Sequence, residues 1–173
     1  MIAIRKMLAP DRDAALAIIN AAAQAYRDVI PADRWHEPYM PRAELEAEIG
    51  NGVMFWVAEE GGLLAGVMGF QDKGAVALVR HAYVAPTGQR KGVGTMLLRQ
   101  VASLADKPLL IGTWADASWA IDFYRRNGFG LVPKEDKESL LRTYWSIPER
   151  QVETSVVLAD GRWMDGRRAE ADG

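Results

Sequence analysis

The residues with the clearest chemical potential lie in the stretch VAPTGQRKGVGTMLL, residues 84–98. An apolar run ends here at a proline, and a helical pattern begins at about Gly92, directly after a basic turn. The first N–H groups of such a helix have no partner within it and carry the positive end of its dipole. Gly92 and Gly94 leave the backbone accessible, while Arg90 and Lys91 add positive charge. The turn therefore predicts a site for an anion such as a pyrophosphate.

Two common phosphate-binding motifs are excluded by the letters of this turn. A P-loop needs four residues between its glycines, whereas only Val93 separates Gly92 from Gly94. A dinucleotide fingerprint needs a third glycine where Leu97 stands. A plain strand-to-helix turn, with glycines for geometry and basic residues for solubility, remains as the alternative interpretation.

The composition bounds the other kinds of chemistry. The 173 residues contain no cysteine and two histidines, His36 and His81. A thiolate nucleophile is therefore excluded, and a zinc site would have few ligands. The net charge of −2 gives no general attraction to nucleic acid or to an anionic membrane. We predict no metal, no nucleic-acid partner and no membrane partner.

The hydrophobic patterns predict an α+β protein with a sheet of mixed direction. Apolar runs bounded by turn residues predict strands at about 2–7, 53–60, 63–71, 76–84, 108–114, 128–133 and 151–159. Helical spacing predicts helices at about 10–30, 42–49, 92–105 and 116–127, the last with Asp116 as N-cap and Gly128 as C-terminal stop.

One domain is expected over residues 1–160, followed by a flexible C-terminal tail over residues 161–173. The first residues lack the pattern of a signal peptide, and no apolar run reaches the length needed to span a bilayer. The cytoplasm is therefore the default location.

Two segments together resemble a known family. QRKGVG, Gln89–Gly94, is similar to the QxxGxG pyrophosphate loop of the GNAT superfamily of acyl-CoA-dependent N-acetyltransferases. AIDFYRRNGF, Ala120–Phe129, is similar to the AxxFYxxxGF helix of that family. The resemblance implies a mixed, mostly antiparallel central sheet of about seven strands flanked by about four helices. It also implies that the strand ending at Val84 and the strand of residues 109–114 splay apart, leaving a notch for acetyl-CoA.

The resemblance also assigns the coenzyme site. The pyrophosphate would lie on the amides of Gln89–Gly94, with pantetheine along the strand ending at Val84. Tyr124 matches the family's tyrosine, whose phenol can protonate the departing thiolate, and a tyrosine packed in the core is the alternative. Relatives often carry asparagine where Ala117 stands, so either Ser118 or Asp116 is expected to replace its contacts to the pantetheine arm, or these contacts are lost. The implied coenzyme-binding residues are Ala82, Tyr83, Val84, Gln89, Arg90, Lys91, Gly92, Val93, Gly94, Thr95, Ser118, Phe123 and Tyr124.

The general base is less clearly marked. Many relatives have a glutamate where Leu78 stands, and the run of residues 76–84 contains no carboxylate. His81 is the titratable residue nearest the implied notch, and an imidazole suits base chemistry near neutral pH. The alternatives are a histidine with only a packing role and a water chain to a distant group such as Glu37 or Glu153. A backbone amide near Ala82–Val84 is expected to meet the oxyanion.

The acceptor site is expected on an aromatic, proline-rich connection and on a later loop. Aromatic walls with a carboxylate suit a cationic amine through cation–π and ionic contacts. The alternative is that these residues cap the helices and the sheet edge. The predicted acceptor-binding residues are Tyr26, Trp35, Glu37, Tyr39 and Tyr144.

These features predict an enzyme, an N-acetyltransferase that transfers an acetyl group from acetyl-CoA directly to a primary amine of a small molecule or peptide. Direct transfer is expected because no cysteine is available to carry the acyl group. Three alternatives stay open: an enzyme that uses another acyl-CoA donor or acylates a hydroxyl, a non-catalytic acyl-CoA sensor, and a protein that binds a partner through its tryptophans. The sequence also leaves open the acceptor amine and whether the chain forms a homodimer.

Overall fold

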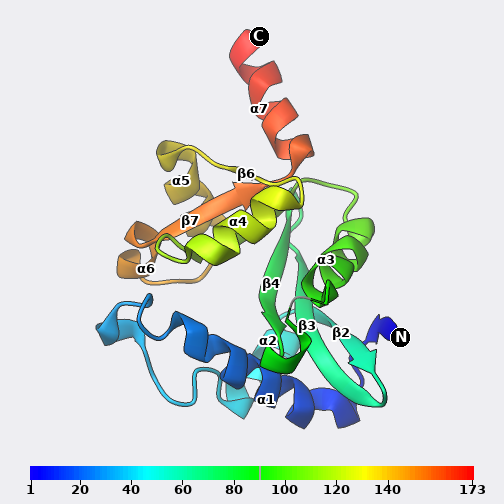
Figure 1. Cartoon of the computed structure of the whole chain (residues 1–173). Helices are drawn as coiled ribbons and strands as arrows, with labels where there is room; N and C mark the ends of the chain where they lie inside the picture. The colour runs from blue at the N-terminus through cyan, green and yellow to red at the C-terminus, as the bar shows by residue number, and fades with distance from the viewer. Residues whose placement is uncertain (90) are drawn as a thin grey trace. The chain divides into compact units, whose positions relative to one another are not determined.

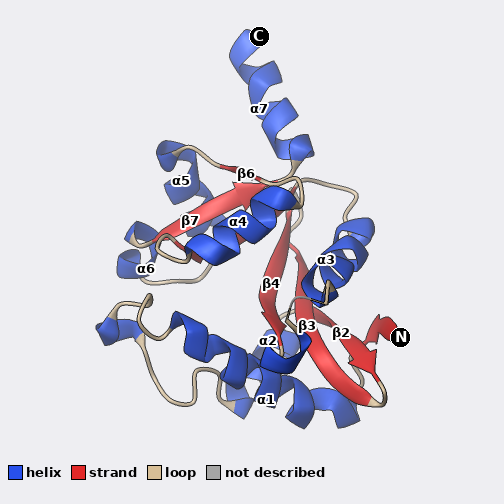
Figure 2. Cartoon of the chain, viewed as in Figure 1, coloured by secondary structure: helices blue, strands red, loops and turns tan. Residues whose placement is uncertain are grey.

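The structure is a computed structural model that describes residues 1–89 and 91–173 (Figures 1 and 2). Its contacts divide the chain into two compact units, which are described separately below. Unit 1 comprises residues 1–72 and 79–104, and unit 2 comprises residues 73–78 and 105–173. The prediction of one domain over residues 1–160 stays a prediction.

Unit 1 is an antiparallel meander with three helices. Strand β1 (Ile2–Lys6) pairs with β2 (Met54–Glu60), and β2 pairs with β3 (Leu63–Asp72), both antiparallel. Most of β4 (Ala77–Val84) follows next to β3. The helices are α1 (Arg12–Ala23), α2 (Arg42–Gly50) and α3 (Val93–Leu104), and short 3-10 turns cover Ala9–Asp11, Gln24–Tyr26, Ala32–Arg34 and Pro86–Gly88.

Unit 2 is built on three strands and four helices. Strand β7 (Ser155–Ala159) lies between β5 (Leu109–Trp114) and β6 (Gly130–Leu131) and is antiparallel to both. The first residue of β4, Ala77, donates its N–H to the Pro108 carbonyl at 2.9 Å. The helices are α4 (Ser118–Arg126), α5 (Lys134–Tyr144), α6 (Glu149–Glu153) and α7 (Gly161–Asp172).

The strand order is β1-β2-β3-β4-β5-β7-β6, which confirms the predicted α+β class with a seven-stranded sheet. The described residues form more helices than the four predicted. Three of these helices begin at local signals: α5 follows Pro133, α6 follows Pro148, and α7 follows Asp160, whose carboxylate accepts from the Trp163 N–H at 3.3 Å. Helix α6 also shortens the strand predicted over 151–159, and α7 occupies the residues predicted as a tail.

Two predicted helix ends differ from the structure, and one is confirmed. Helix α1 ends at Ala23 rather than near Pro31, and α4 begins after Ala117 rather than after an Asp116 cap. Gly128 does end α4, because its φ of +92° allows the left-handed turn there. In that turn the Phe129 N–H donates to the Tyr124 carbonyl at 3.1 Å.

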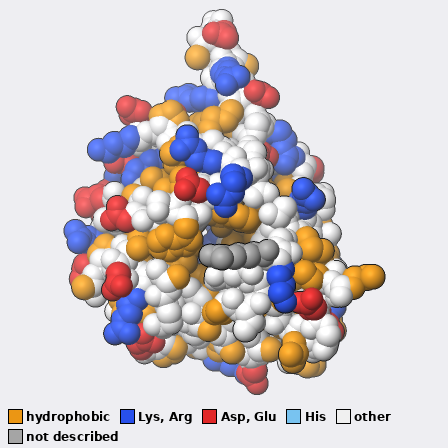
Figure 3. Space-filling view, in the orientation of Figure 1, with side chains coloured by type: hydrophobic (Ala, Val, Ile, Leu, Met, Phe, Trp, Pro, Cys, Tyr) orange, Lys and Arg blue, Asp and Glu red, His pale blue; other side chains and the backbone are white. Residues whose placement is uncertain are grey.

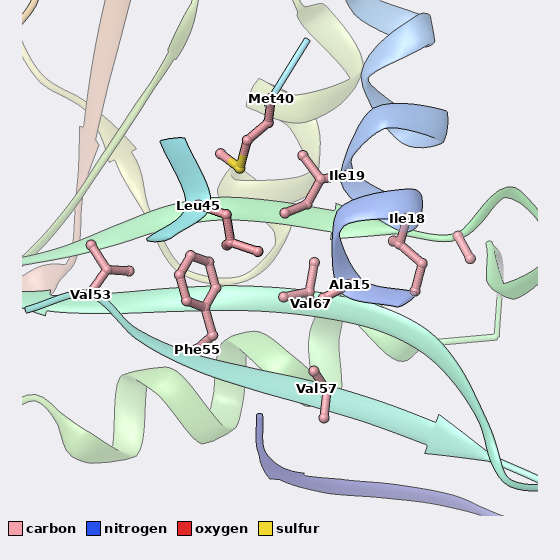
Figure 4. Close-up of a cluster of buried hydrophobic side chains, with 10 residues drawn as sticks. Ala15, Ile18, Ile19, Met40, Leu45, Val53, Phe55, Val57 and Val67 are labelled. Carbon is pink, nitrogen blue, oxygen red and sulfur yellow. The ribbon is translucent and has the colours of Figure 1, made fainter. Parts of the chain in front are cut away.

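Each unit has its own hydrophobic cluster. In unit 1, Ile18 and Ile19 project from α1 toward the strands that carry Phe55 and Val67 (Figure 4). The full cluster is Ala15, Ile18, Ile19, Met40, Leu45, Val53, Phe55, Val57, Val67 and Ala85. In unit 2 the cluster is Val76, Leu78, Leu110, Val132, Leu141, Val152, Val157 and Ala159.

Helix α3 packs on the other face of β3 from α1. Successive strand residues point to opposite faces, so Gly66 faces away from the cluster that holds Val67. A Cβ placed on Gly66 would lie 2.8 Å from Val93 Cγ1 and 3.0 Å from Leu97 Cδ1. The glycine therefore lets the first turns of α3 approach the sheet closely.

Replacing Gly66 with alanine is expected to lower the free energy of unfolding by about 1–3 kcal/mol, the usual cost of overpacking a core. The added methyl group meets the Tyr83 carbonyl at 3.3 Å as well as α3, so only part of the strain can relax. Denaturant unfolding with Gly50→Ala as control measures this, because a Cβ at Gly50 meets nothing within 4 Å. Equal stability of the two variants would contradict the close approach.

Candidate functional site

The turn before α3 has the geometry that an anion site requires. Gly92 has a φ of +79°, and a Cβ there would meet nothing within 4 Å. Its carbonyl accepts from the Met96 N–H at 3.0 Å, so the helical hydrogen bonds begin here. The N–H groups of residues 93–95 lie before this first helical hydrogen bond, so they have no acceptor within the helix. They point out of the start of α3 beside an unobstructed backbone, which suits a phosphate oxygen.

The preceding segment ties this turn to β3. The Ala85 N–H donates to the Ala65 carbonyl, and the Gly88 N–H donates to the Ala85 carbonyl, both at 2.8 Å. Gly88 is buried, and a Cβ there would lie 3.1 Å from the Ala65 oxygen. The chain therefore reaches Gln89, which is exposed, along a path that is fixed by backbone contacts.

Positive charge is available beside the turn. Lys91 is exposed, and its Nζ lies 3.5 Å from a Glu60 carboxylate oxygen. Such an exposed ion pair is weak, so a more highly charged anion can compete for the ammonium. Arg90, predicted to bind the coenzyme, lies outside the described residues. On the face shown in Figure 3, acidic and basic side chains are interspersed. An anion would therefore be recognised by the local turn rather than by a broad charged surface.

His81 occupies a strained position in β4. Its φ of +54° is the one positive φ among the non-glycine residues in the described part of the chain. Such a conformation is uncommon outside glycine and is found preferentially at functional sites. On the neighbouring strand, a Cβ at Gly69 would come within 2.8 Å of the Arg80 carbonyl, so β3 accommodates this irregular backbone through a glycine.

A charged network holds the His81 side chain. Its Nε2 lies 2.7 Å from Oε2 of Glu48 in α2, and the Arg80 Nη2 lies 3.0 Å from the same oxygen. Arg80 also donates to the Gln71 side chain at 3.0 Å. The imidazole stacks on Phe55 with ring centroids 6.0 Å apart. The ring is largely buried, with 15% of its side chain exposed, and is fixed on two sides.

Four of the five predicted acceptor residues come together in unit 1. Tyr39 stacks on Trp35 at 5.6 Å, and Trp35 donates its indole N–H to Glu37 at 3.2 Å. Tyr83 makes edge-to-face contacts with Tyr39 at 6.3 Å and with Tyr26 at 6.2 Å. Tyr83 therefore joins this group through its ring, whereas the sequence assigned it only to the coenzyme. We call Tyr26, Trp35, Tyr39 and Tyr83 the aromatic wall.

The aromatic wall and His81 lie on one face of unit 1. Tyr39 and Tyr83 pack against the cluster between α1 and the strands, and that cluster includes Phe55, on which His81 stacks. Tyr83 is two residues beyond His81 on β4. Helix α3 covers the other face of β3, as Gly66 shows. The histidine is therefore on the side of the sheet that carries the predicted acceptor residues.

Four predicted residues lie in unit 2: Ser118, Phe123, Tyr124 and Tyr144. Tyr124 is buried and makes edge-to-face contacts with Phe123 at 5.2 Å and Phe129 at 6.3 Å. Ser118 is exposed and begins α4, and its N–H donates to the Asp116 carbonyl at 3.0 Å. Tyr144 ends α5 and packs against the cluster of unit 2. Their roles stay predictions.

Glu48, the partner of His81, is not among the site residues predicted from the sequence. Helix α2 places glutamates at 44, 46 and 48, and their spacing alone does not distinguish them. The sequence contains one signal for the end of this helix, because a glycine such as Gly52 is typical of the position just after a helix. Ending α2 there puts Glu48 in its last turn, but only the folded chain brings that turn to β4.

Several solved structures share this fold at low sequence identity. The PaiA N-acetyltransferase of Thermoplasma acidophilum, crystallised in complex with coenzyme A, is 16% identical, with a TM-score of 0.70 over 92% of this chain and 98% of its own. The ribosomal-protein-S18-alanine N-acetyltransferase of Escherichia coli is 18% identical, with a TM-score of 0.64 over 92% and 93%. YncA of Salmonella typhimurium, solved with its cofactor acetyl-CoA, is 23% identical, with a TM-score of 0.58 over 76% and 81%. These proteins define the class of fold as that of GNAT acetyltransferases.

The family assignment agrees with the fold. Residues 51–130 match the family model of the acetyltransferase (GNAT) domain, a range that contains both Gln89–Gly94 and Ala120–Phe129. The match and the shared fold confirm the resemblance carried by the two motifs and the predicted acyltransferase class. No curated protein matches the sequence.

The described residues carry neither a metal-binding cluster nor a membrane-spanning helix. Over residues 1–89 and 91–173, no three metal-ligating side chains are grouped so that they could hold an ion. In the same residues no helix is both long enough and apolar enough to cross a membrane.

Proposed function

We propose that this protein transfers an acetyl group from acetyl-CoA to a primary amine of a small molecule or peptide. The observation that carries the proposal is the open turn at Gly92 at the start of α3, within the segment that matches the acetyltransferase family. The donor set fits the diphosphate of a coenzyme, because the turn offers unobstructed backbone N–H groups at the positive end of a helix dipole, and Lys91 adds a positive charge next to Gly92.

The residues proposed to hold acetyl-CoA are the amides of Gln89–Gly94 and Thr95, together with Val84 and its neighbours on β4. When bound, acetyl-CoA supplies an acetyl thioester that is open to attack by an amine. The chain's task is then to orient the amine, to remove its proton, and to supply a proton to the departing sulfur. A β4 amide near Ala82–Val84 is proposed to donate to the carbonyl oxygen as negative charge develops there.

His81 is proposed as the general base. It is held on the face that carries the aromatic wall, and an imidazole can accept a proton near neutral pH. The wall offers half-buried aromatic rings, and Glu37 adds a carboxylate beside Trp35. Such a surface favours an acceptor molecule that bears a second positive charge besides the reacting amine, because that charge can make cation–π and ionic contacts. Tyr124 is proposed to protonate the thiolate, as the family resemblance implies.

Gly92→Glu is expected to weaken acetyl-CoA binding at least about 100-fold, because a carboxylate would then face the phosphates across the turn. Calorimetric titration of the folded variant with acetyl-CoA measures this loss. The matched control is Gly62→Glu, because Gly62 has a φ of +80°, is exposed, and also has open space around its missing Cβ. The two glycines therefore have nearly the same φ, and the comparison tests the position of the added charge.

The outcomes of this titration separate the readings. Binding that is lost in Gly92→Glu and kept in Gly62→Glu supports the coenzyme turn. Equal binding by wild type and both variants would refute this use of the turn. Binding without thiol release for any amine would point instead to the acyl-CoA sensor, and release only with a different acyl thioester would change the donor.

A further inference from the structure

The His81–Glu48 contact defines which ring nitrogen of His81 carries hydrogen. A carboxylate can only accept hydrogen bonds, and its Oε2 lies 2.7 Å from His81 Nε2. Nε2 must therefore carry the proton in the neutral ring. The lone pair is then on Nδ1, which becomes the basic atom of the side chain.

Glu48 is itself held in place from two directions. Helix α2 ends in a left-handed turn at Gly52, with a φ of +93°, where the Val53 N–H donates to the Glu48 carbonyl at 3.0 Å. On the side chain, the Arg80 guanidinium lies 3.0 Å from Oε2. The carboxylate is 18% exposed, so it is largely withdrawn from competing water. Arg80 favours its ionised form, which is the form that accepts from an imidazole N–H.

We infer that Glu48 is a positioning residue that fixes His81 in the Nε2–H tautomer, so that Nδ1 removes the proton from the acceptor amine. This inference rests on the proposed function. As the amine nitrogen forms its bond to the acetyl carbon, the C–S bond breaks and the sulfur leaves as a thiolate. The amine proton moves to Nδ1, and the charge on the ring is balanced by Glu48 through Nε2–H.

The tautomer can be measured without any activity, because the chain contains only two histidines. His36 is an internal contrast: its Nδ1 lies 2.9 Å from the Pro38 carbonyl, an acceptor, so its neutral ring carries hydrogen on Nδ1. In ¹⁵N-histidine-labelled protein, at a pH where both rings are neutral, long-range ¹H–¹⁵N correlations should show opposite tautomers. A His36→Asn variant assigns the two patterns.

Glu48→Gln is the main variant, because a glutamine side chain can donate as well as accept and so no longer selects one tautomer. The expected spectrum shows His81 as a mixture of tautomers. The expected kcat is lower by at least about 10-fold, since a general base contributes about 100- to 10,000-fold, with the KM for acetyl-CoA within about twofold. The matched control is Glu44→Gln, an exposed glutamate on the same helix, which should leave both readouts unchanged.

His81→Asn tests the base separately, since asparagine tolerates a positive φ but has no basic nitrogen. The inference is overturned if His81 stays in the Nε2–H form in Glu48→Gln, or if that variant loses stability while keeping kcat. The proposed function fails differently: wild type would release no thiol with any amine, or His81→Asn would turn over as fast as wild type. The tautomer spectra still decide the Glu48 contact in that case.

Discussion

Replacing Tyr124 with phenylalanine is expected to lower kcat for acetyl transfer by about 100-fold while the affinity for acetyl-CoA is nearly kept. A general acid contributes about 100- to 10,000-fold to a rate, and the phenolic hydroxyl is the only group that the substitution removes. The ring contacts with Phe123 and Phe129 are retained, so the free energy of unfolding should change by about 1 kcal/mol. Steady-state kinetics measure kcat, calorimetric titration measures the affinity for acetyl-CoA, and denaturant unfolding measures the free energy of unfolding.

A packing role for Tyr124 predicts the reverse pattern. Phenylalanine would then turn over like wild type, and Tyr124→Ala would lose stability because it empties a buried ring position. A fall in kcat for Tyr124→Phe of about 100-fold, with stability changed by no more than about 1 kcal/mol, is the result that packing cannot produce. It would also locate the acid on the second of the two family motifs.

Lys137→Met is expected to lower the free energy of unfolding by about 3 kcal/mol. Lys137 is 6% exposed, and its Nζ donates to the Val152 and Ser155 carbonyls at 2.7 Å each and to the Glu153 carbonyl at 3.4 Å. Methionine keeps most of the volume but leaves these carbonyls, where α6 gives way to β7, without their donor. Each buried acceptor left unpaired costs about 1–3 kcal/mol.

Denaturant unfolding measures this cost, with Lys134→Met as the matched control on an exposed position of the same helix. The control should change stability by less than about 0.5 kcal/mol. A Lys137→Met variant as stable as wild type would show that an apolar contact replaces the three hydrogen bonds at no cost.

The same pair of proteins carries a pH signature. Burial lowers the pKa of Lys137 below its ordinary value of 10.5. In the alkaline range between the lowered pKa and 10.5, the unfolded chain therefore binds more protons than the folded chain. The contribution of Lys137 to stability thus rises with pH in that range. The difference in unfolding free energy between wild type and Lys137→Met should widen there, and a narrowing difference would contradict the direction of the shift.

Much of the fold follows from local signals in the sequence. The strands of the meander have alternating patterns with glycine turns. Gly128 has a positive φ and ends α4, as its position after Asn127 predicts. The later helices were missed because α5 and α6 begin after prolines inside a segment of mixed pattern. Asp116 has the right residue type for a cap, yet its carbonyl rather than its side chain contacts the start of α4.

The site divides in the same way. The glycine turn could be found from its letters, because a helix start after glycines has a local physical meaning. His81 could be chosen only as the nearest titratable side chain, since its positive φ and its contact with Glu48 depend on α2 meeting β4. Four members of the predicted acceptor set lie together because Tyr83, on a different element, joins the rings of Tyr26 and Tyr39.

Acetylation of an amine by acetyl-CoA forms one thiol for each acetylated amine, so the proposed reaction is tested by following both products. The purified 173-residue chain is mixed with acetyl-CoA and a panel of primary amines, including doubly cationic ones. Thiol and acetylated amine are quantified by absorbance and mass spectrometry. We expect equal amounts of thiol and acetylated amine for at least one member, and strong loss of both in His81→Asn. Tight binding of acetyl-CoA with no acetylated amine across the panel would contradict amine acetylation.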